Sequence, residues 1–217
     1  MTGFSTVKIA KDGLPTIITL AVLGVLFSAL LPWILPGATM LVLCGFALWF
    51  YRDPDRAMPE KKDGEDVFVS PADGKIVEIM PAEHAFTGAS TKIGIFMNAF
   101  SVHVNRAPCE GVVEYLEYVP GKKIAAFAPK ASEVNERHYV GLRTAYGPVL
   151  LVQIAGLLAR RIVCRVRRGD TLSAGERYGM IKLGSKVDIY LPAGVEFSVK
   201  LGDKVYAGKS VLGVVRK

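Results

Sequence analysis

YGMIKLGSKVDIYL, residues 178–191, sets the kind of structure and chemistry that this chain can support. Two short apolar runs of β type flank Gly184 and Ser185, so the stretch predicts strands around an unhindered peptide bond. A serine hydroxyl beside a glycine carbonyl can attack that carbonyl in an N-to-O acyl shift of the backbone. A solvent-facing hairpin turn is the simpler interpretation of the same dipeptide. The surrounding sequence has to decide between the two.

On both sides of this stretch, residues 67–217 consist of short runs rich in β-branched and aromatic residues, separated by glycine or proline. This pattern predicts a mainly β catalytic domain. Within it, the pattern GDxxxAG occurs at residues 169–175 and again at 202–208, an offset of 33 residues. A duplicated turn signature of this kind predicts two related, lipoyl-like hairpins packed as a small barrel or sandwich.

The N-terminal part is different, because Gly13 to Tyr51 contains no charged residue and no histidine. Leu14–Leu31 and Gly37–Tyr51 predict two short apolar helices with a proline-marked turn between them. At about 1.5 Å per residue they reach roughly 27 and 22 Å, against a hydrocarbon core of about 30 Å. We therefore expect residues 1–51 to form a membrane-anchoring hairpin that either spans the bilayer or dips into it. A charged linker, residues 52–66, follows it.

The charge balance favours an anionic partner, since the formal net charge is +7 and the pI about 9.3. No recognition-helix or stacking motif accompanies the basic residues, so we expect a membrane surface and no nucleic acid. Lys8 and Lys11 precede the hairpin and Arg52 and Arg56 follow it, which predicts the cytoplasmic face of the cell membrane. The three cysteines lack CxxC spacing, so neither a metal site nor a disulfide framework is expected.

Three residue types could together activate a nucleophile: Asp73 in the SPADG turn, His103 in the extended FSVHVNRAP run, and Ser185. Each also has an ordinary structural explanation, as a turn residue, a strand histidine and a hairpin serine. Arg106 could bind a phosphate or a carboxylate, or be a strand-end charge. His138, at the start of a strand, is a weaker candidate for the site.

Taken together, these segments resemble the phosphatidylserine decarboxylase proenzymes, and in length the short form of that family. The resemblance covers nearly the whole chain, and its motifs occur in a shared order and spacing. They are the apolar N-terminus, YRDPDR (51–56), SPADG (70–74), FSVHVNRAPCEG (100–111), VNER (134–137) and LGS (183–185).

The resemblance implies self-cleavage between Gly184 and Ser185, with Asp73 and His103 assisting. The products would be a long chain, 1–184, and a short chain, 185–217, associated as a heterodimer that could oligomerise further. Ser185 would become a covalent pyruvoyl group, so the cofactor, pyruvate in bound form, would be made from Ser185 itself. This group would form a Schiff base with the serine head group of phosphatidylserine, release CO2 and leave the ethanolamine lipid, with His103 as proton donor. An ether-linked, archaeal-type lipid is an alternative substrate.

The chain departs from the longer forms of the family at two positions. Those forms have H-x-x-H where this chain has His103-Val-Asn-Arg106, and Thr after the Gly-Ser pair where this chain has Lys186. Arg106 cannot act as a base near neutral pH. Either His103 serves both self-cleavage and decarboxylation, or His138 contributes.

Two other functions fit parts of the sequence. A membrane-anchored, lipoyl-like adaptor or carrier would use the duplicated GDxxxAG segments and carry a modification on Lys182, with the chain left intact. A membrane-bound serine hydrolase would use Ser185 directly, but the chain has no G-x-S-x-G elbow.

Overall fold

The computed structural model describes residues 7–30, 34–61, 64–126, 130–157, 161–182 and 185–216, and it divides into two compact units, residues 1–55 and 56–217. Leu183 and Gly184, and with them the predicted cleavage bond, lie outside the described residues. The architecture is mainly β with an N-terminal helical hairpin, as the sequence predicted.

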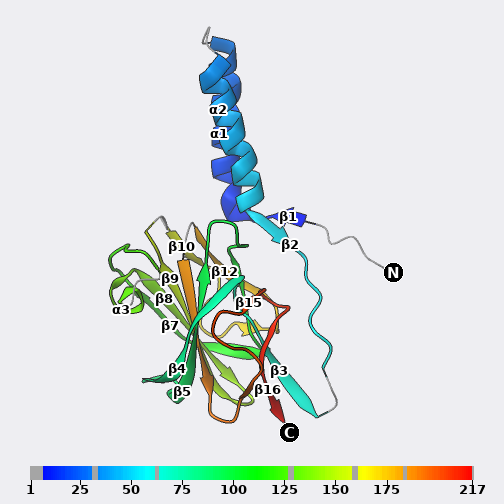
Figure 1. Ribbon diagram of the computed structural model, residues 1–217, viewed down its shortest axis with the longest axis vertical. Helices are drawn as coiled ribbons and strands as arrows, with labels where there is room; N and C mark the ends of the chain where they lie inside the picture. The colour runs from blue at the N-terminus through cyan, green and yellow to red at the C-terminus, as the bar shows by residue number, and fades with distance from the viewer. Residues whose placement is uncertain are drawn as a thin grey trace. The chain divides into compact units, whose positions relative to one another are not determined.

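The first unit is a pair of helices that lie side by side (Figure 1). Its elements are β1 (Val7–Ile9), the 3-10 helix η1 (Lys11–Gly13), α1 (Leu14–Leu30), α2 (Ile34–Phe50) and β2 (Arg52–Pro54). Small residues allow the close approach of the helices: a side chain at Gly24 would meet Leu41, and one at Gly37 would meet Ser28. At the base of the hairpin, β1 pairs antiparallel with β2.

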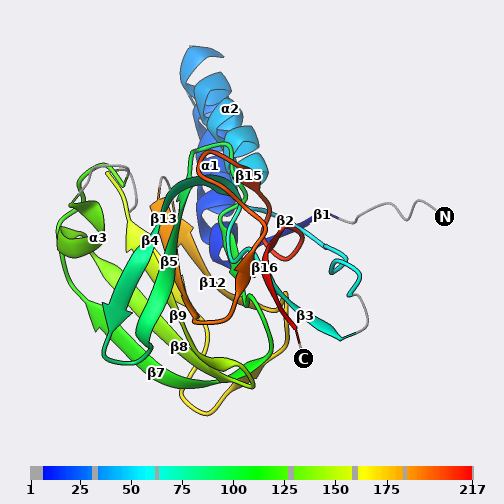
Figure 2. The same ribbon diagram turned by 60° about the horizontal axis from the view of Figure 1, so that its bottom comes forward.

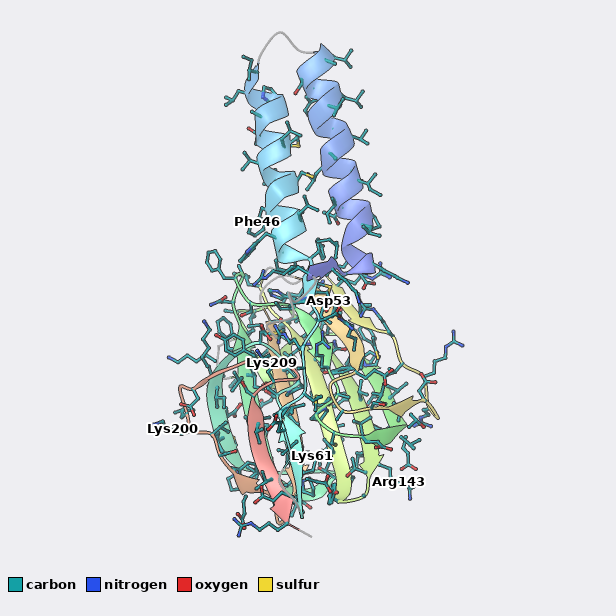
Figure 3. The ribbon with its side chains drawn as sticks, turned by 90° about the vertical axis from the view of Figure 1, so that its right-hand side faces the viewer. Phe46, Asp53, Lys61, Arg143, Lys200 and Lys209 are labelled. Atoms are coloured by element: carbon teal, nitrogen blue, oxygen red, sulfur yellow. The ribbon has the colours of Figure 1, made fainter. Side chains whose placement is uncertain are left out.

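The outer surface of this hairpin is apolar. Its side chains project outward from both helices (Figure 3), and several large ones are more than half exposed. They include Ile18, Val25, Leu30, Ile34, Leu35 and Val42. Among the described residues, one helical stretch, Lys11–Leu30, is long and apolar enough to cross a membrane. An apolar surface of this extent is typical of a segment that contacts lipid.

The second unit is built around one curled, antiparallel sheet (Figure 2). Within the described residues this sheet has eight strands in the order β11-β7-β8-β9-β13-β5-β4-β15. Their bounds are β4 (Gly74–His84), β5 (Gly88–Met97), β7 (Gly111–Val119), β8 (Arg137–Thr144), β9 (Gly147–Ala155), β11 (Thr171–Leu172), β13 (Ser185–Pro192) and β15 (Lys204–Val205).

Two smaller antiparallel sheets pack against one face of the curled sheet and complete the core. One has the order β10-β12-β6 and the other β14-β16-β3. Their strands are β3 (Glu65–Val69), β6 (Val104–Arg106), β10 (Arg161–Cys164), β12 (Arg177–Lys182), β14 (Glu196–Phe197) and β16 (Val211–Arg216), and α3 (Ala131–Val134) is a single helical turn. The core is a cluster of buried aliphatic residues with the aromatic side chains of Phe68 and Tyr178.

The GDxxxAG repeat is a real structural duplication, although its copies are edge strands and not the expected hairpins. The first copy contributes β11, which pairs with β7, and the second contributes β15, which pairs with β4. Equivalent hydrogen bonds fix both, since Gly169 N–H donates to Val113 O and Gly202 N–H to Ile76 O, each at 2.8 Å. Both glycines have positive φ, 91° and 94°, a conformation that favours glycine.

The duplication extends to the turns before β7 and β4, the strands with which these segments pair. This similarity was not found from the sequence. PADGKI at residues 71–76 corresponds to PCEGVV at 108–113. The two turns exchange hydrogen bonds, from Val69 N–H to Pro108 O (2.8 Å) and from Arg106 N–H to Pro71 O (2.9 Å). The same duplication relates the two halves of the large sheet, because β11, β7, β8 and β9 occupy the places that β15, β4, β5 and β13 occupy in the other half. The centre of the sheet is the β9-β13 pair, which contains Ser185.

Candidate active site

Ser185 is the first residue of β13 and is fully buried. It pairs with Met97 at the end of β5 on one side and with Ala155 at the end of β9 on the other. The Ser185 hydroxyl has no hydrogen-bond partner among the described residues. A buried hydroxyl in this state is costly in a purely structural serine, so it is a candidate for a chemical role. The solvent-facing hairpin turn considered for this position is therefore wrong.

His103 comes to the same region from the loop that follows β5. Its backbone carbonyl accepts a hydrogen bond from Ile181 N–H (3.3 Å), on the strand β12 that leads toward Ser185. The side chain is fully buried, and its Nδ1 lies 2.9 Å from Ser101 O. Because a carbonyl can only accept, this contact places the proton of a neutral imidazole on Nδ1 and leaves Nε2 as the basic nitrogen.

Asp73 precedes β4 at the same end of the sheet, where Lys75 pairs with Phe96. Arg56 donates two hydrogen bonds to the Asp73 carboxylate, from Nη1 to Oδ1 and from Nη2 to Oδ2, the latter at 2.8 Å. The N–H of Ala207 also donates to Oδ1 (2.8 Å). These are the contacts of the Asp73 carboxylate among the described residues. In the sequence, Arg56 belongs to the basic flank of the hairpin and to the YRDPDR motif, and neither pattern indicates its pairing with Asp73.

The topology therefore places Asp73, His103 and Ser185 at one end of the curled sheet. Strand pairing bridges the separation of Asp73 and Ser185 in the sequence, since β4 lies beside β5 and β5 beside β13. His103 follows β5 and is joined to β12 by the hydrogen bond from Ile181. No pattern in the sequence could have shown this, because catalytic groups are recognised by geometry. Their individual roles remain predictions.

Two buried amides lie on the same side of the sheet and were not singled out from the sequence. Gln153 pairs with Val187, two residues along β13 from Ser185 and on the same face. Its Nε2 donates to Asn105 Oδ1 (2.9 Å), and both side chains are fully buried. The Gln153 Oε1 has no partner among the described residues. The interior beside Ser185 is thus polar.

Neither of the two weaker candidates lies on β5 or β9, the strands that pair with Ser185. His138 pairs with Gln153 across β8 and β9, on the inner face, and burial lowers its pKa, opposed by a backbone hydrogen bond at Tyr139. Arg106 is buried between the two GDxxxAG segments, where its Nη1 donates to Gly175 O (3.0 Å) and its side chain packs against Gly208. These contacts give Arg106 a structural role, because its side chain connects the two GDxxxAG segments.

A surface cavity of about 380 Å³ lies elsewhere, on the side that includes Lys61 and Arg143 (Figure 3). It also contacts Cys109 and Glu110, which occupy the repeat position equivalent to Ala72 and Asp73. None of the predicted site residues lines it. Burial, reinforced by Glu110, raises the pKa of Cys109 to about 12, so this thiol is unreactive near neutral pH.

Comparison with known proteins decides what this arrangement belongs to. The family model for phosphatidylserine decarboxylase matches residues 43–213. The chain belongs to the phosphatidylserine decarboxylase family. It is 42% identical over 213 residues to the phosphatidylserine decarboxylase proenzyme of Chlorobium phaeobacteroides, covering 98% of each chain. It is 47% identical over 206 residues to the proenzyme of Solidesulfovibrio magneticus, covering 94% of each.

The predicted resemblance is therefore confirmed, and this phosphatidylserine decarboxylase family member is a lyase of phospholipid metabolism. A further relative, the proenzyme of Oleidesulfovibrio alaskensis, is 44% identical over 98% of this chain and 97% of its own. The match reaches from the second helix of the hairpin to β16. It favours the decarboxylase over the adaptor and the serine hydrolase.

Proposed function

We propose that this chain is a self-processing decarboxylase of phosphatidylserine that cleaves itself between Gly184 and Ser185 and converts Ser185 into a pyruvoyl group. The observation that carries the proposal is the buried hydroxyl of Ser185 at the first position of a central strand, where it has no hydrogen-bond partner within the described part of the chain. After cleavage, residues 1–184 and 185–217 would remain associated through β13, which pairs on both sides with strands of the long chain.

The position suits a pyruvoyl group for a physical reason. An ordinary cleaved chain would begin at residue 185 with an ammonium, which is costly to bury. Its neighbours across the sheet, Met97 and Ala155, are buried and uncharged. A pyruvoyl group has no charge and is no larger than the serine it replaces, so the fully buried site can hold it.

In the cleavage step, the Ser185 oxygen bonds to the Gly184 carbonyl carbon as the peptide C–N bond breaks, which converts the amide into an ester. Removal of the Ser185 α-proton expels the Gly184 carboxylate, and hydrolysis then releases ammonia and leaves the ketone. The Nε2 of His103 is the base that we assign to the serine proton. Asp73, held in place by Arg56 at the same end of the sheet, would assist this step.

In the decarboxylation step, the pyruvoyl group would supply a carbonyl that accepts the electrons left when CO2 departs from an amine-bearing head group. His103 would deliver the proton that the head-group carbon then needs, from the nitrogen that Ser101 does not occupy. The buried setting of Ser185 and His103 keeps bulk water from this carbon. His138 would contribute through Gln153, its partner across the strands.

The substrate would reach the site from the membrane. The apolar hairpin and the net charge of +7 support attachment to the cytoplasmic face of an anionic cell membrane. In fractionated cells we expect the full chain with the membranes, released by detergent and not by high salt. Recovery in the soluble fraction at high salt would contradict insertion of the hairpin.

The experiment that tests the function is CO2 release by the detergent-solubilised full chain from vesicles that contain phosphatidylserine. The matched control is Ser185→Ala, which removes the attacking oxygen and should release none. A parallel sample with the ether-linked serine lipid tests the glycerol backbone. Release by Ser185→Ala at the rate of the unchanged chain would overturn the proposal.

A further inference from the structure

Lys186, the residue after Ser185, lies at the centre of a buried cluster of charges. It is 5% exposed, and because strand side chains alternate, it points to the face opposite Ser185. Its Nζ lies 2.5 Å from Glu78 Oε2, 3.0 Å from Asp188 Oδ1 and 3.1 Å from Ser132 Oγ. The cluster is closed by Ser132, whose hydroxyl donates to Asp188 Oδ2 (3.0 Å).

The cluster connects the two products of the proposed cleavage. Lys186 and Asp188 belong to residues 185–217, whereas Glu78 on β4 and Ser132 in α3 belong to residues 1–184. Glu78 is also held by Lys92 on β5, at 2.9 Å. Three contacts therefore cross from the long chain to the short chain, next to the end that cleavage would create. They are Glu78–Lys186, Ser132–Lys186 and Ser132–Asp188.

The cluster favours the charged forms of Lys186 and Glu78, whereas burial raises the pKa of Asp188 above its ordinary value in spite of Lys186. Burial alone would lower the pKa of Lys186, but Asp188 and Glu78 outweigh it and hold this pKa above its ordinary value. Burial would likewise raise the pKa of Glu78, and the hydrogen bonds from Lys186 and Lys92 reverse that effect. Lys186 thus stays protonated, and a protonated amine cannot attack a neighbouring ketone.

The end of a strand is where its hydrogen bonds open most readily. Before cleavage, Ser185 is held by covalent bonds on both sides. After cleavage, it would be the free end of β13, and its position would depend on strand pairing and on the first side chains that follow.

We propose that Lys186 is a positioning residue whose contacts with Glu78 and Ser132 hold the newly formed end of the short chain in place for decarboxylation. This inference rests on the proposed self-cleavage. It also gives a reason for the lysine that follows the Gly-Ser pair in this chain. Lys186 lies directly after the residue at the cleavage site, and its side chain contacts Glu78 and Ser132 of the long chain.

The test removes the Lys186–Glu78 ion pair and the Ser132 hydroxyl contacts that cross between the two chains, and it leaves the Lys186–Asp188 pair and the pairing of β13 intact. The variant Glu78→Gln with Ser132→Ala should still cleave at least about half as completely as the unchanged chain. Its kcat per cleaved chain should fall about fivefold or more at unchanged KM, because the lipid site is intact and the reacting end is displaced. Amide exchange at Val187 should rise about tenfold.

The matched control is Lys92→Met, which removes the other cation from Glu78 but lies wholly within the long chain. We expect it to keep kcat within about twofold. A second variant, Lys186→Arg, keeps the positive charge and should retain more activity per cleaved chain than Lys186→Met.

Three results would overturn the inference. They are a kcat per cleaved chain within twofold of the unchanged protein in the double variant, an equal loss in Lys92→Met, and a parallel loss of cleavage and turnover. An uncut but otherwise active unchanged chain would instead remove the proposed function itself, so the two failures can be told apart.

Discussion

Arg56 donates two hydrogen bonds to the carboxylate of Asp73, and each of the two side chains is only 8% exposed. Arg56 also donates to Ala207 O (2.7 Å), and Ala207 N–H donates back to Asp73. This closed arrangement joins the YRDPDR and SPADG motifs to the second GDxxxAG segment. It fixes the turn from which Asp73 would act.

Removing one partner of this ion pair should be strongly destabilising. Arg56→Met leaves a buried carboxylate without its counter-charge, so we expect the free energy of unfolding to fall by about 3 kcal/mol. Arg56→Lys keeps the charge but not the two-point geometry, so its free energy of unfolding should lie between those of the unchanged chain and Arg56→Met. Denaturant titration of the Ser185→Ala chain, which cannot cleave, measures both. The control Lys61→Met breaks an exposed pair with Asp66 and should cost about 0.5 kcal/mol; equal losses in both would refute the argument.

The hydrogen bond between Gln153 and Asn105 should contribute to the stability of the fold and to the rate of self-cleavage at Ser185. Gln153→Leu keeps the approximate volume but leaves Asn105 Oδ1 without its donor, at a cost of about 1–3 kcal/mol in unfolding free energy. We also expect slower self-cleavage, followed by the appearance of the short chain on a gel. Unchanged stability and an unchanged cleavage rate would show that the pair is dispensable.

Acidification should destabilise the β unit through His84. The ring of His84 stacks on Tyr139 at 5.5 Å between centroids, and its Nδ1 accepts the N–H of Phe86 (3.1 Å). Burial lowers its pKa below 6.5, opposed by Glu117. The unfolded chain therefore binds the proton more readily, so stability is present above pH 6.5 and falls as the pH decreases through the folded value. His84→Gln should flatten the decline in a pH series of melting temperatures, leaving the part due to His138; an unchanged slope would argue against it.

The first glycine of one GDxxxAG segment and the last glycine of the other allow a test of packing at two positions that are not equivalent in the repeat. Gly208 and Gly169 both have positive φ, but a Cβ at Gly208 would lie 3.0 Å from Arg106 Cδ, whereas no atom of the described residues lies within 4 Å of a Cβ at Gly169. Each alanine substitution should cost about 1 kcal/mol for the left-handed backbone. Gly208→Ala should cost more, because it also displaces Arg106 from between the repeats. Equal melting temperatures for the two variants would contradict this packing.

Periodicity and composition were enough to predict the apolar hairpin and the β-rich body, because both depend on local patterns. The GDxxxAG offset revealed part of the duplication. It did not reveal the edge-strand pairing or the related turns at residues 71–76 and 108–113, where only the proline and the glycine are identical.

The site was predictable only in part. Ser185, His103 and Asp73 stood out as residue types in recognisable segments. Arg56, Gln153 and the partners of Lys186 did not, since their significance comes from strand pairings between distant segments. Lys186 stood out in the sequence only as a departure from the longer forms of the family, and its burial among charges could not be seen there.

The central claim is tested most directly by the intact mass of the purified chain beside that of Ser185→Ala. The account predicts two fragments from the unchanged protein, residues 1–184 and a second fragment lighter by one ammonia than residues 185–217, and a single uncut chain from the variant. A single uncut chain in both samples, from a preparation that releases CO2 from phosphatidylserine, would contradict it.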